Sequence, residues 1–182
     1  MSIREICKKG AINMILQRRV LSKLGDSVST DDIIQEKYLT SSSAEDMGKI
    51  CLRDLDPDFR RKMAPGGFLV AGKEFGCGSS REQAPVALKA AGVQAVLAEE
   101  FARIFYRNAL NICLPVVECP RAVEAFNLGD ELIVDLSTGM IRNITKGTTV
   151  QGIPIPPFLL SMMNAGGLIE FLKKQLAEER ER

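Results

Sequence analysis

Residues 65–98 read PGGFLVAGKEFGCGSSREQAPVALKAAGVQAVLA, and this stretch decides the fold. The apolar run at 68–71 predicts a short buried strand, and a glycine-rich loop at 72–80 follows it. A helix comes next; Gly92 ends it, and residues 95–98 predict a second buried strand. A strand, a helix and another strand in this order are typical of parallel strands joined by a right-handed crossover.

The same alternation continues downstream. Residues 101–111 predict a helix, and residues 114–118 predict a third apolar strand. The residues that recur at helical spacing, and that we expect on the buried face of this helix, are Phe101, Ile104, Phe105 and Ala109. The centre of the chain is therefore expected to be an α/β unit.

Smaller elements flank this centre. Residues 20–24 predict an opening strand, and residues 131–135 and 140–143 predict a β-hairpin. The Ala-Gly-Gly sequence at 165–167 separates a short helix from a last helix in which leucines recur every four residues, before a solvated charged tail.

Length and composition agree with one domain. The chain has 182 residues, 46% of them hydrophobic and 26% charged, which is enough to bury a substantial core. We expect a single domain at 19–182, preceded by a poorly ordered extension at 1–18. The formal net charge is only +1, which is unlike the basic surface of a protein that binds DNA or RNA, so nucleic acid is not an expected partner.

Residue types that are missing or unpaired restrict the chemistry further. The sequence contains no histidine, which excludes an imidazole base and histidine-ligated zinc. Its five cysteines form no Cys-x-x-Cys pair, so reduced thiols are expected and no metal site held by this chain. No apolar run is long enough for a membrane span or a secretory signal. We expect a cytoplasmic protein without a membrane partner.

Two phosphate-binding motifs almost fit the glycine-rich segment. Residues 67–73 have the spacing of a P-loop, but Glu74 stands where a hydroxyl must reach magnesium. Residues 76–81 begin like a dinucleotide fingerprint, but Arg81 replaces the third glycine that close helix packing requires. Neither motif therefore predicts nucleotide binding.

The loop makes better sense as an anion site. Gly78 permits unusual backbone conformations, Ser79 and Ser80 add two hydroxyls, and Arg81 adds a planar fork of donors. Pro85 allows regular helix to begin only at about residue 82 or 83. These groups therefore lie at a helix N-terminus, where free N–H groups favour an anion such as a carboxylate.

Plainer structural explanations remain open for several of these features. The loop serines could simply cap the helix, with Arg81 in a salt bridge to Glu82 or Glu74. Arg103 and Arg107 lie one helical turn apart and face either a partner or water. A solvated turn, not a calcium site, is expected for three neighbouring acids, Asp54, Asp56 and Asp58.

The glycine-rich motif resembles the hallmark of a known family. Residues 75–82, followed by Ala-Pro at 84–85, are similar to the small subunit of 3-isopropylmalate dehydratase, the two-chain relative of aconitase. The similarity covers about residues 19–176. Three further matches occur in the same order, at residues 25–31, 101–108 and 165–168.

The resemblance implies a fold, a partner and a reaction. The fold would be a swivelling β/β/α domain like the C-terminal domain of aconitase, with parallel βα units and a smaller β portion. A separate large subunit would carry a 4Fe-4S cluster, and this chain would bind no cofactor. The pair would be a hydro-lyase that converts 2-isopropylmalate to 3-isopropylmalate in leucine biosynthesis, by dehydration and rehydration of this dicarboxylate.

The same resemblance implies roles for individual residues. Ser79 matches the catalytic serine that takes the proton alpha to a carboxylate, and Asp31 matches an active-site acid. Ser80 and Arg81, with Gly78 beside them, match the groups that hold the carboxylate. The family usually has histidine where this chain has Gln83, which leaves the pH profile open.

The resemblance also implies that the loop at 38–41 determines substrate choice, because this loop contacts the variable side group of the substrate in related enzymes. Leu39 and Thr40 carry no charge, which favours an uncharged side group such as isopropyl over a third carboxylate, although the loop could also be a simple mobile linker. The alternatives are a small subunit for dimethylmalate, citramalate or homoaconitate, or a carboxylate-binding module without catalysis.

Overall fold

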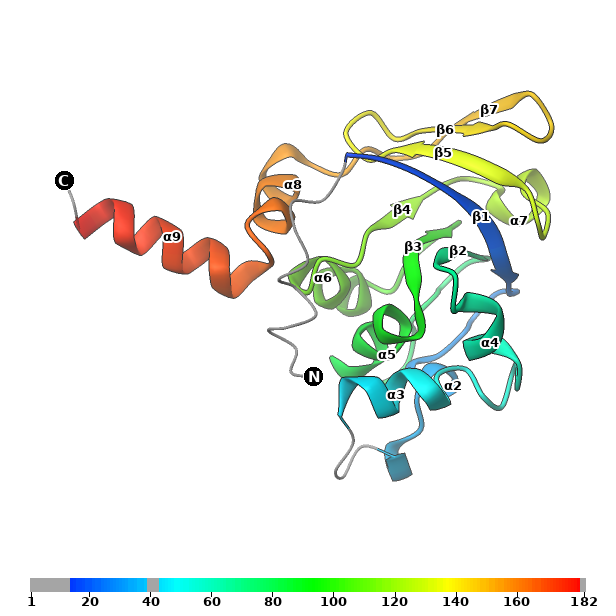
Figure 1. The fold of residues 1–182 in the computed structure, drawn as a ribbon, viewed down its shortest axis with the longest axis horizontal. Coiled ribbons are helices and arrows are strands. Elements are labelled where there is room, and N and C mark those ends of the chain that lie inside the picture. The colour runs from blue at the N-terminus through cyan, green and yellow to red at the C-terminus, as the bar shows by residue number, and fades with distance from the viewer. Residues whose placement is uncertain (1–13, 39–42, 181–182) are drawn as a thin grey trace.

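The computed structural model of the chain describes residues 14–38 and 43–180. Within them one sheet has the strand order β4-β3-β2-β1-β5-β6-β7. It is half parallel and half antiparallel, and Figure 1 shows it curling so that the yellow hairpin arches over the green strands. The strands are β1 (Ile15–Lys23), β2 (Gly67–Ala71), β3 (Val93–Ala98), β4 (Val116–Glu118), β5 (Glu131–Asp135), β6 (Met140–Asn143) and β7 (Thr148–Gln151).

Helices pack beside the parallel strands, and α5 lies against α3, α6 and β3 (Figure 1). A 3-10 turn at Glu36–Tyr38 precedes α3. The helices are α2 (Thr30–Ile33), α3 (Ala44–Ile50), α4 (Phe59–Met63), α5 (Gln83–Ala91), α6 (Arg103–Asn111), α7 (Ala122–Ala125), α8 (Pro157–Asn164) and α9 (Leu168–Arg180). No helix in the described part of the chain is long and apolar enough to cross a membrane.

The predicted α/β centre is confirmed. Strand β2 is fully buried and pairs in parallel with β3, which pairs in parallel with β4. Helix α5 begins at Gln83, as Pro85 required, and ends at Gly92, whose φ of 111° is the left-handed conformation expected of a C-terminal glycine. The hairpin of β5 and β6 also forms as predicted.

Two expectations near the N-terminus need correction. Strand β1 begins at Ile15, not at Val20, so residues 15–18 lie within the sheet and not in an extension. They extend the strand because residues 15–19 pair antiparallel with β5, while the other end of β1 pairs in parallel with β2. Residues 1–13 lie outside the described residues.

The expected buried face of α6 was wrong at one position. Phe101, Phe105 and Ala109 are buried, but the side chain of Ile104 is 51% exposed. The three buried residues follow one another at intervals of four, whereas Ile104 is rotated about 100° away from Phe105 on the helix. The apolar stripe is therefore narrower than predicted, and Ile104 faces outward.

Strand β7 was not predicted from the sequence. Its residues, Thr-Thr-Val-Gln, are mostly exposed and lack a buried alternating face, so no apolar pattern marks it. Beyond β7 the chain returns to the parallel strands, where the Ile153 N–H donates to the Glu118 carbonyl over 2.8 Å. This bond brings the segment after β7 to the end of β4.

The last helix forms, but only the first of its repeating leucines, Leu168, packs against the core. Leu172 and Leu176 are 46% and 55% exposed, and Figure 1 shows α9 projecting from the body of the molecule. A hydrophobic repeat predicts a helix whether or not another element covers its apolar side.

Candidate active site

Two loops at the carboxyl end of the parallel strands are joined by backbone hydrogen bonds. The Gly76 N–H donates to the Val28 carbonyl over 2.7 Å, and the Thr30 N–H donates to the Cys77 carbonyl over 2.8 Å. The segment at 25–31 is therefore held directly against the glycine-rich loop. Ligands in open α/β sheets commonly bind outside the carboxyl ends of the strands.

The glycine-rich loop is anchored on α6 through aromatic rings. Phe75 makes edge-on contacts with Phe101 and Phe105, with ring centroids 6.0 and 5.2 Å apart. Gly76, with φ +81°, lies directly against the Phe105 ring, so that a Cβ there would collide with it. The loop can approach α6 this closely only because residue 76 has no side chain.

We expect Gly76→Ala to lower the free energy of unfolding by about 2–5 kcal/mol. The alanine would have to adopt a left-handed backbone conformation, and its Cβ would overlap the buried ring of Phe105. Gly129→Ala is a matched control, because Gly129 has φ +85° and nothing lies within 4 Å of the position that its Cβ would take. The control is expected to lose only the backbone part, about 1–2 kcal/mol. Urea denaturation of both variants measures the difference, and equal losses would show that contact with Phe105 does not hold the loop.

Arg81 is largely buried, and groups in α2 and in the turn after it hold its side chain. Its side chain is 12% exposed, its Nη1 forms a charged hydrogen bond to Asp31 and a 3.0 Å bond to the Ile34 carbonyl, and its Nη2 lies 3.7 Å from Glu36. Salt bridges to Glu82 or Glu74, the plainer alternative from the sequence, are therefore wrong. The guanidinium is fixed in orientation before any ligand arrives.

A serine cap on α5 is also wrong. The N-cap residue is Glu82, and no side chain forms a capping hydrogen bond there. Ser79 and Ser80 are both exposed in the loop that precedes the helix. The two hydroxyls are thus free of the capping role that would have explained them without a ligand.

Thr30 was not among the predicted site residues, but it supports Ser79 through a hydrogen bond. Its side chain is only 2% exposed, and its hydroxyl donates to the Ser79 carbonyl over 2.9 Å and lies 3.5 Å from Ser79 Oγ. Thr30 is the first residue of α2, whose capping box is formed by Ser29 and Asp32. That capping pattern was the signal in the sequence that residue 30 is held in a defined place.

A cavity of about 270 Å³ brings together three of the seven predicted site residues. Gly78, Ser79 and Arg81 line it, whereas Asp31 reaches it only through Arg81 and Ser80 does not belong to its lining. Leu39 and Thr40 lie outside the described residues. The polar residues of the lining that the sequence did not predict for the site are Thr30, Arg103 and Asn108.

The described part of the chain offers no ligand set for a metal or a cluster. No group of three or more His, Cys, Asp or Glu side chains comes together within residues 14–38 and 43–180. Burial raises the pKa of the Cys51 thiol, and it raises the pKa of Cys119 to about 11, with the charge of Glu99 adding to the effect. Both thiols therefore hold their protons more tightly than an exposed cysteine does.

Comparison with known proteins gives one consistent result. Residues 31–121 match the aconitase C-terminal domain family. The 3-isopropylmalate dehydratase small subunit of Caldicellulosiruptor bescii is 53% identical over 86% of this chain and 95% of its own length. The isopropylmalate/citramalate isomerase small subunit of Methanocaldococcus jannaschii is 48% identical over 87% of this chain and 94% of its own.

A solved structure agrees with the sequence relatives. The crystal structure of 3-isopropylmalate dehydratase from Methanocaldococcus jannaschii superimposes with a TM-score of 0.84 at 37% identity, covering 92% of this chain and 99% of that one. The similarity includes the loop with Ser79 and Arg81 as well as the sheet around it. The chain belongs to the family of 3-isopropylmalate dehydratase small subunits, which carries the aconitase C-terminal domain.

Proposed function

We propose that this chain is the small subunit of a cytoplasmic two-chain hydro-lyase that interconverts 2-isopropylmalate and 3-isopropylmalate. The observation that carries the proposal is the cavity in which Ser79 lies beside the oriented guanidinium of Arg81. The names of relatives about half identical over most of the chain support the same substrate. Leucine biosynthesis is the pathway that this reaction serves.

In the proposed reaction, Ser79 Oγ takes the proton from the carbon alpha to a carboxylate. The hydroxyl on the neighbouring carbon accepts a proton from an acid of the assembled site and leaves as water, and a double bond forms between the two carbons. In the second half, a water molecule returns a proton to that acid and adds its hydroxyl to the carbon that was deprotonated, and Ser79 Oγ gives its proton to the other carbon. Arg81 and the backbone at Gly78, which line the cavity, bind the carboxylate; Ser80, which lies outside this lining, is the third group that the resemblance assigns to the carboxylate. Asp31 acts through Arg81, whose guanidinium it orients.

A serine hydroxyl is a weak acid, so an alkoxide at Ser79 needs local stabilisation. Arg103 brings a positive charge to the same cavity, whereas the Thr30 hydroxyl, 3.5 Å from Ser79 Oγ, already donates its one hydrogen to the Ser79 carbonyl. Arg81 contributes less charge than its type suggests, because Asp31 and Glu36 partly neutralise it. Its main task is to fix a carboxylate by planar hydrogen bonding.

The remaining machinery is proposed to belong to a large subunit. This chain provides no ligands for a 4Fe-4S cluster among its described residues. Such a cluster, held by the partner, would supply the Lewis acid for the leaving hydroxyl. This chain alone is therefore expected to bind a dicarboxylate weakly and to turn none over.

Citramalate is the second candidate substrate. The isopropylmalate/citramalate isomerase small subunit of Methanocaldococcus jannaschii is 48% identical to this chain. Citramalate carries a methyl group where isopropylmalate carries an isopropyl group, so both need an uncharged pocket. Loop 38–41, which contains the uncharged Leu39 and Thr40, is proposed to face this group.

The test is reconstitution with the large subunit encoded in the same genome. The two purified chains are mixed anaerobically and assayed with 2-isopropylmalate, citramalate, dimethylmalate and homoaconitate. We expect the highest kcat/KM for 2-isopropylmalate or citramalate, no turnover by either chain alone, and at least a tenfold lower value for the tricarboxylate, which has no charge partner in the loop. A mixture that binds dicarboxylates without turnover would identify a non-catalytic module instead.

A further inference from the structure

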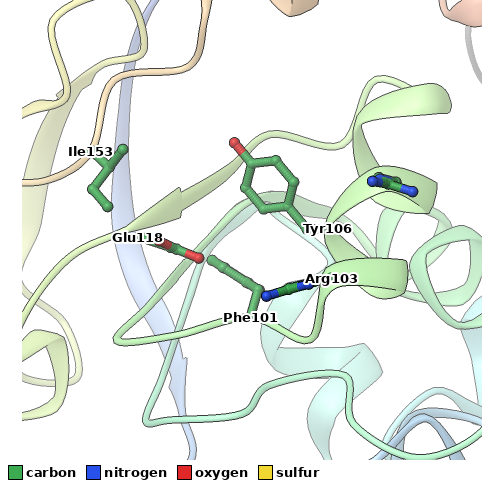
Figure 2. A pocket seen from close by; sticks show the side chains of 6 residues that line it. Phe101, Arg103, Tyr106, Glu118 and Ile153 are labelled. Carbon is green, nitrogen blue, oxygen red and sulfur yellow. The ribbon is translucent and has the colours of Figure 1, made fainter.

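A second hollow lies beside the catalytic cavity, between the start of α6 and the end of β4. Its volume is about 210 Å³. Figure 2 shows Tyr106 and Arg103 reaching toward it from the α6 side, Glu118 and Phe101 beside them, and Ile153 on the opposite side. Arg107, one turn along α6, completes the lining.

The hollow carries two cations without an internal partner. Arg103 and Arg107 are both exposed, and neither forms an ion pair with any residue in the parts of the chain that the structure describes. Glu118 lines the same hollow and is half-buried, but no ion pair joins it to either arginine within those same residues. The two arginines are thus available to carboxylates from outside the chain.

The rest of the lining is suited to a protein surface and not to a small anion. Ile153 is 54% exposed, and Tyr106 is partly exposed. Burial raises the pKa of Tyr106, and the charge of Glu118 raises it further, so the phenol remains a hydrogen-bond donor. A mixture of arginine, tyrosine and exposed apolar side chains is typical of protein interfaces.

The hollow adjoins the catalytic cavity. Arg103 lines both of them, and Phe105, which supports the glycine-rich loop, lies on the same helix. A partner chain that completes the active site must therefore pass over Arg103. The hollow next to Arg103 is therefore the adjoining surface that the partner chain would contact.

We propose that this hollow docks an acidic segment of the large subunit. Carboxylates of that segment pair with Arg103 and Arg107, and an apolar side chain of it packs against Ile153 and the Tyr106 ring. The assignment rests on the proposed function, since it needs a large subunit. The proposal specifies where the two subunits touch and by which interaction: an acidic segment of the large subunit binds beside the active site through ion pairs.

The test measures complex formation separately from chemistry. Arg107→Glu is compared with wild type and with Arg142→Glu, a matched reversal on β6 whose arginine is also exposed and unpaired among the described residues. Titration of each purified small subunit against the large subunit gives Kd, at low and at high salt. Turnover at saturating small subunit gives kcat. Circular dichroism verifies that each variant is folded.

We expect Arg107→Glu to weaken binding by about tenfold or more at low salt, mainly through a slower association, and to bind with less salt dependence than wild type. Its kcat at saturation should stay within about twofold of wild type, because Arg107 does not line the catalytic cavity. Arg142→Glu should resemble wild type in both measurements.

Two results would overturn the inference. One is an unchanged Kd for Arg107→Glu, and the other is a Kd equally weakened by Arg142→Glu, which would reveal only a general effect of net charge. In either case the wild-type pair of subunits would still turn over its substrate. Failure of the proposed function has a different signature, namely no turnover by the wild-type pair on any of the dicarboxylates.

Discussion

Ser79→Ala is expected to lower the kcat of the reconstituted enzyme by about 10²–10⁴-fold, the usual contribution of a general base. The variant should fold and associate normally, because Ser79 is exposed and its hydroxyl has only a 3.5 Å contact with Thr30. The backbone carbonyl that Thr30 uses, at 2.9 Å, remains in place. The loss should therefore appear in kcat while KM and the Kd for the large subunit change little.

Ser161→Ala provides the matched control for this measurement. Ser161 is an exposed serine whose hydroxyl donates to the Pro157 carbonyl within α8, away from the glycine-rich loop. Its removal should leave kcat within about twofold. Near-normal turnover by Ser79→Ala, with the two chains fully associated, would mean that some other group takes the proton.

Arg81→Ala should lower kcat/KM by about 10- to 150-fold, since hydrogen bonds to a charged group contribute about 1.5–3 kcal/mol. The effect is expected mainly in KM, because the guanidinium binds the carboxylate in ground and transition states alike. Asp31→Ala should lower kcat/KM by a smaller factor, because the Ile34 carbonyl still holds Arg81 through a hydrogen bond. Steady-state kinetics of the two single variants and the double variant give the coupling between them.

The double variant decides how Asp31 acts. If Asp31 works by orienting Arg81, the double variant is no worse than Arg81→Ala alone, which is strong non-additivity. Fully additive losses would make Asp31 an acid that touches the substrate by itself. Glu36→Gln is the control: this side chain is 85% exposed and 3.7 Å from Arg81, so its removal should change kcat/KM by less than about twofold.

The parts of the fold that depend on neighbouring residues were predictable from the sequence. Pro85 and Gly92 mark the limits of α5, and two short apolar runs mark β2 and β3. The resemblance of the glycine-rich motif identified the family, and the comparisons confirm it.

The parts that depend on distant contacts were not predictable. Arg81 could have paired with Glu82 or Glu74 next to it, but it pairs with Asp31, which only the hydrogen bonds between the two loops bring near. The support of Ser79 by Thr30 has the same origin. Strand β7 forms because β6 offers a free edge, although its own residues carry no apolar pattern.

The position of β1 in the sheet affects how the chain folds while it is being synthesised. Its first half pairs with β5, so that Ile15 lies opposite Asp135, while its second half pairs with β2. During translation the first half of β1 has no partner strand until the ribosome has synthesised β5. Contacts between residues so far apart in sequence form slowly. An open strand edge pairs readily with other chains. Nascent polypeptides that stop before β5 should therefore aggregate, and chaperones should bind them in that interval.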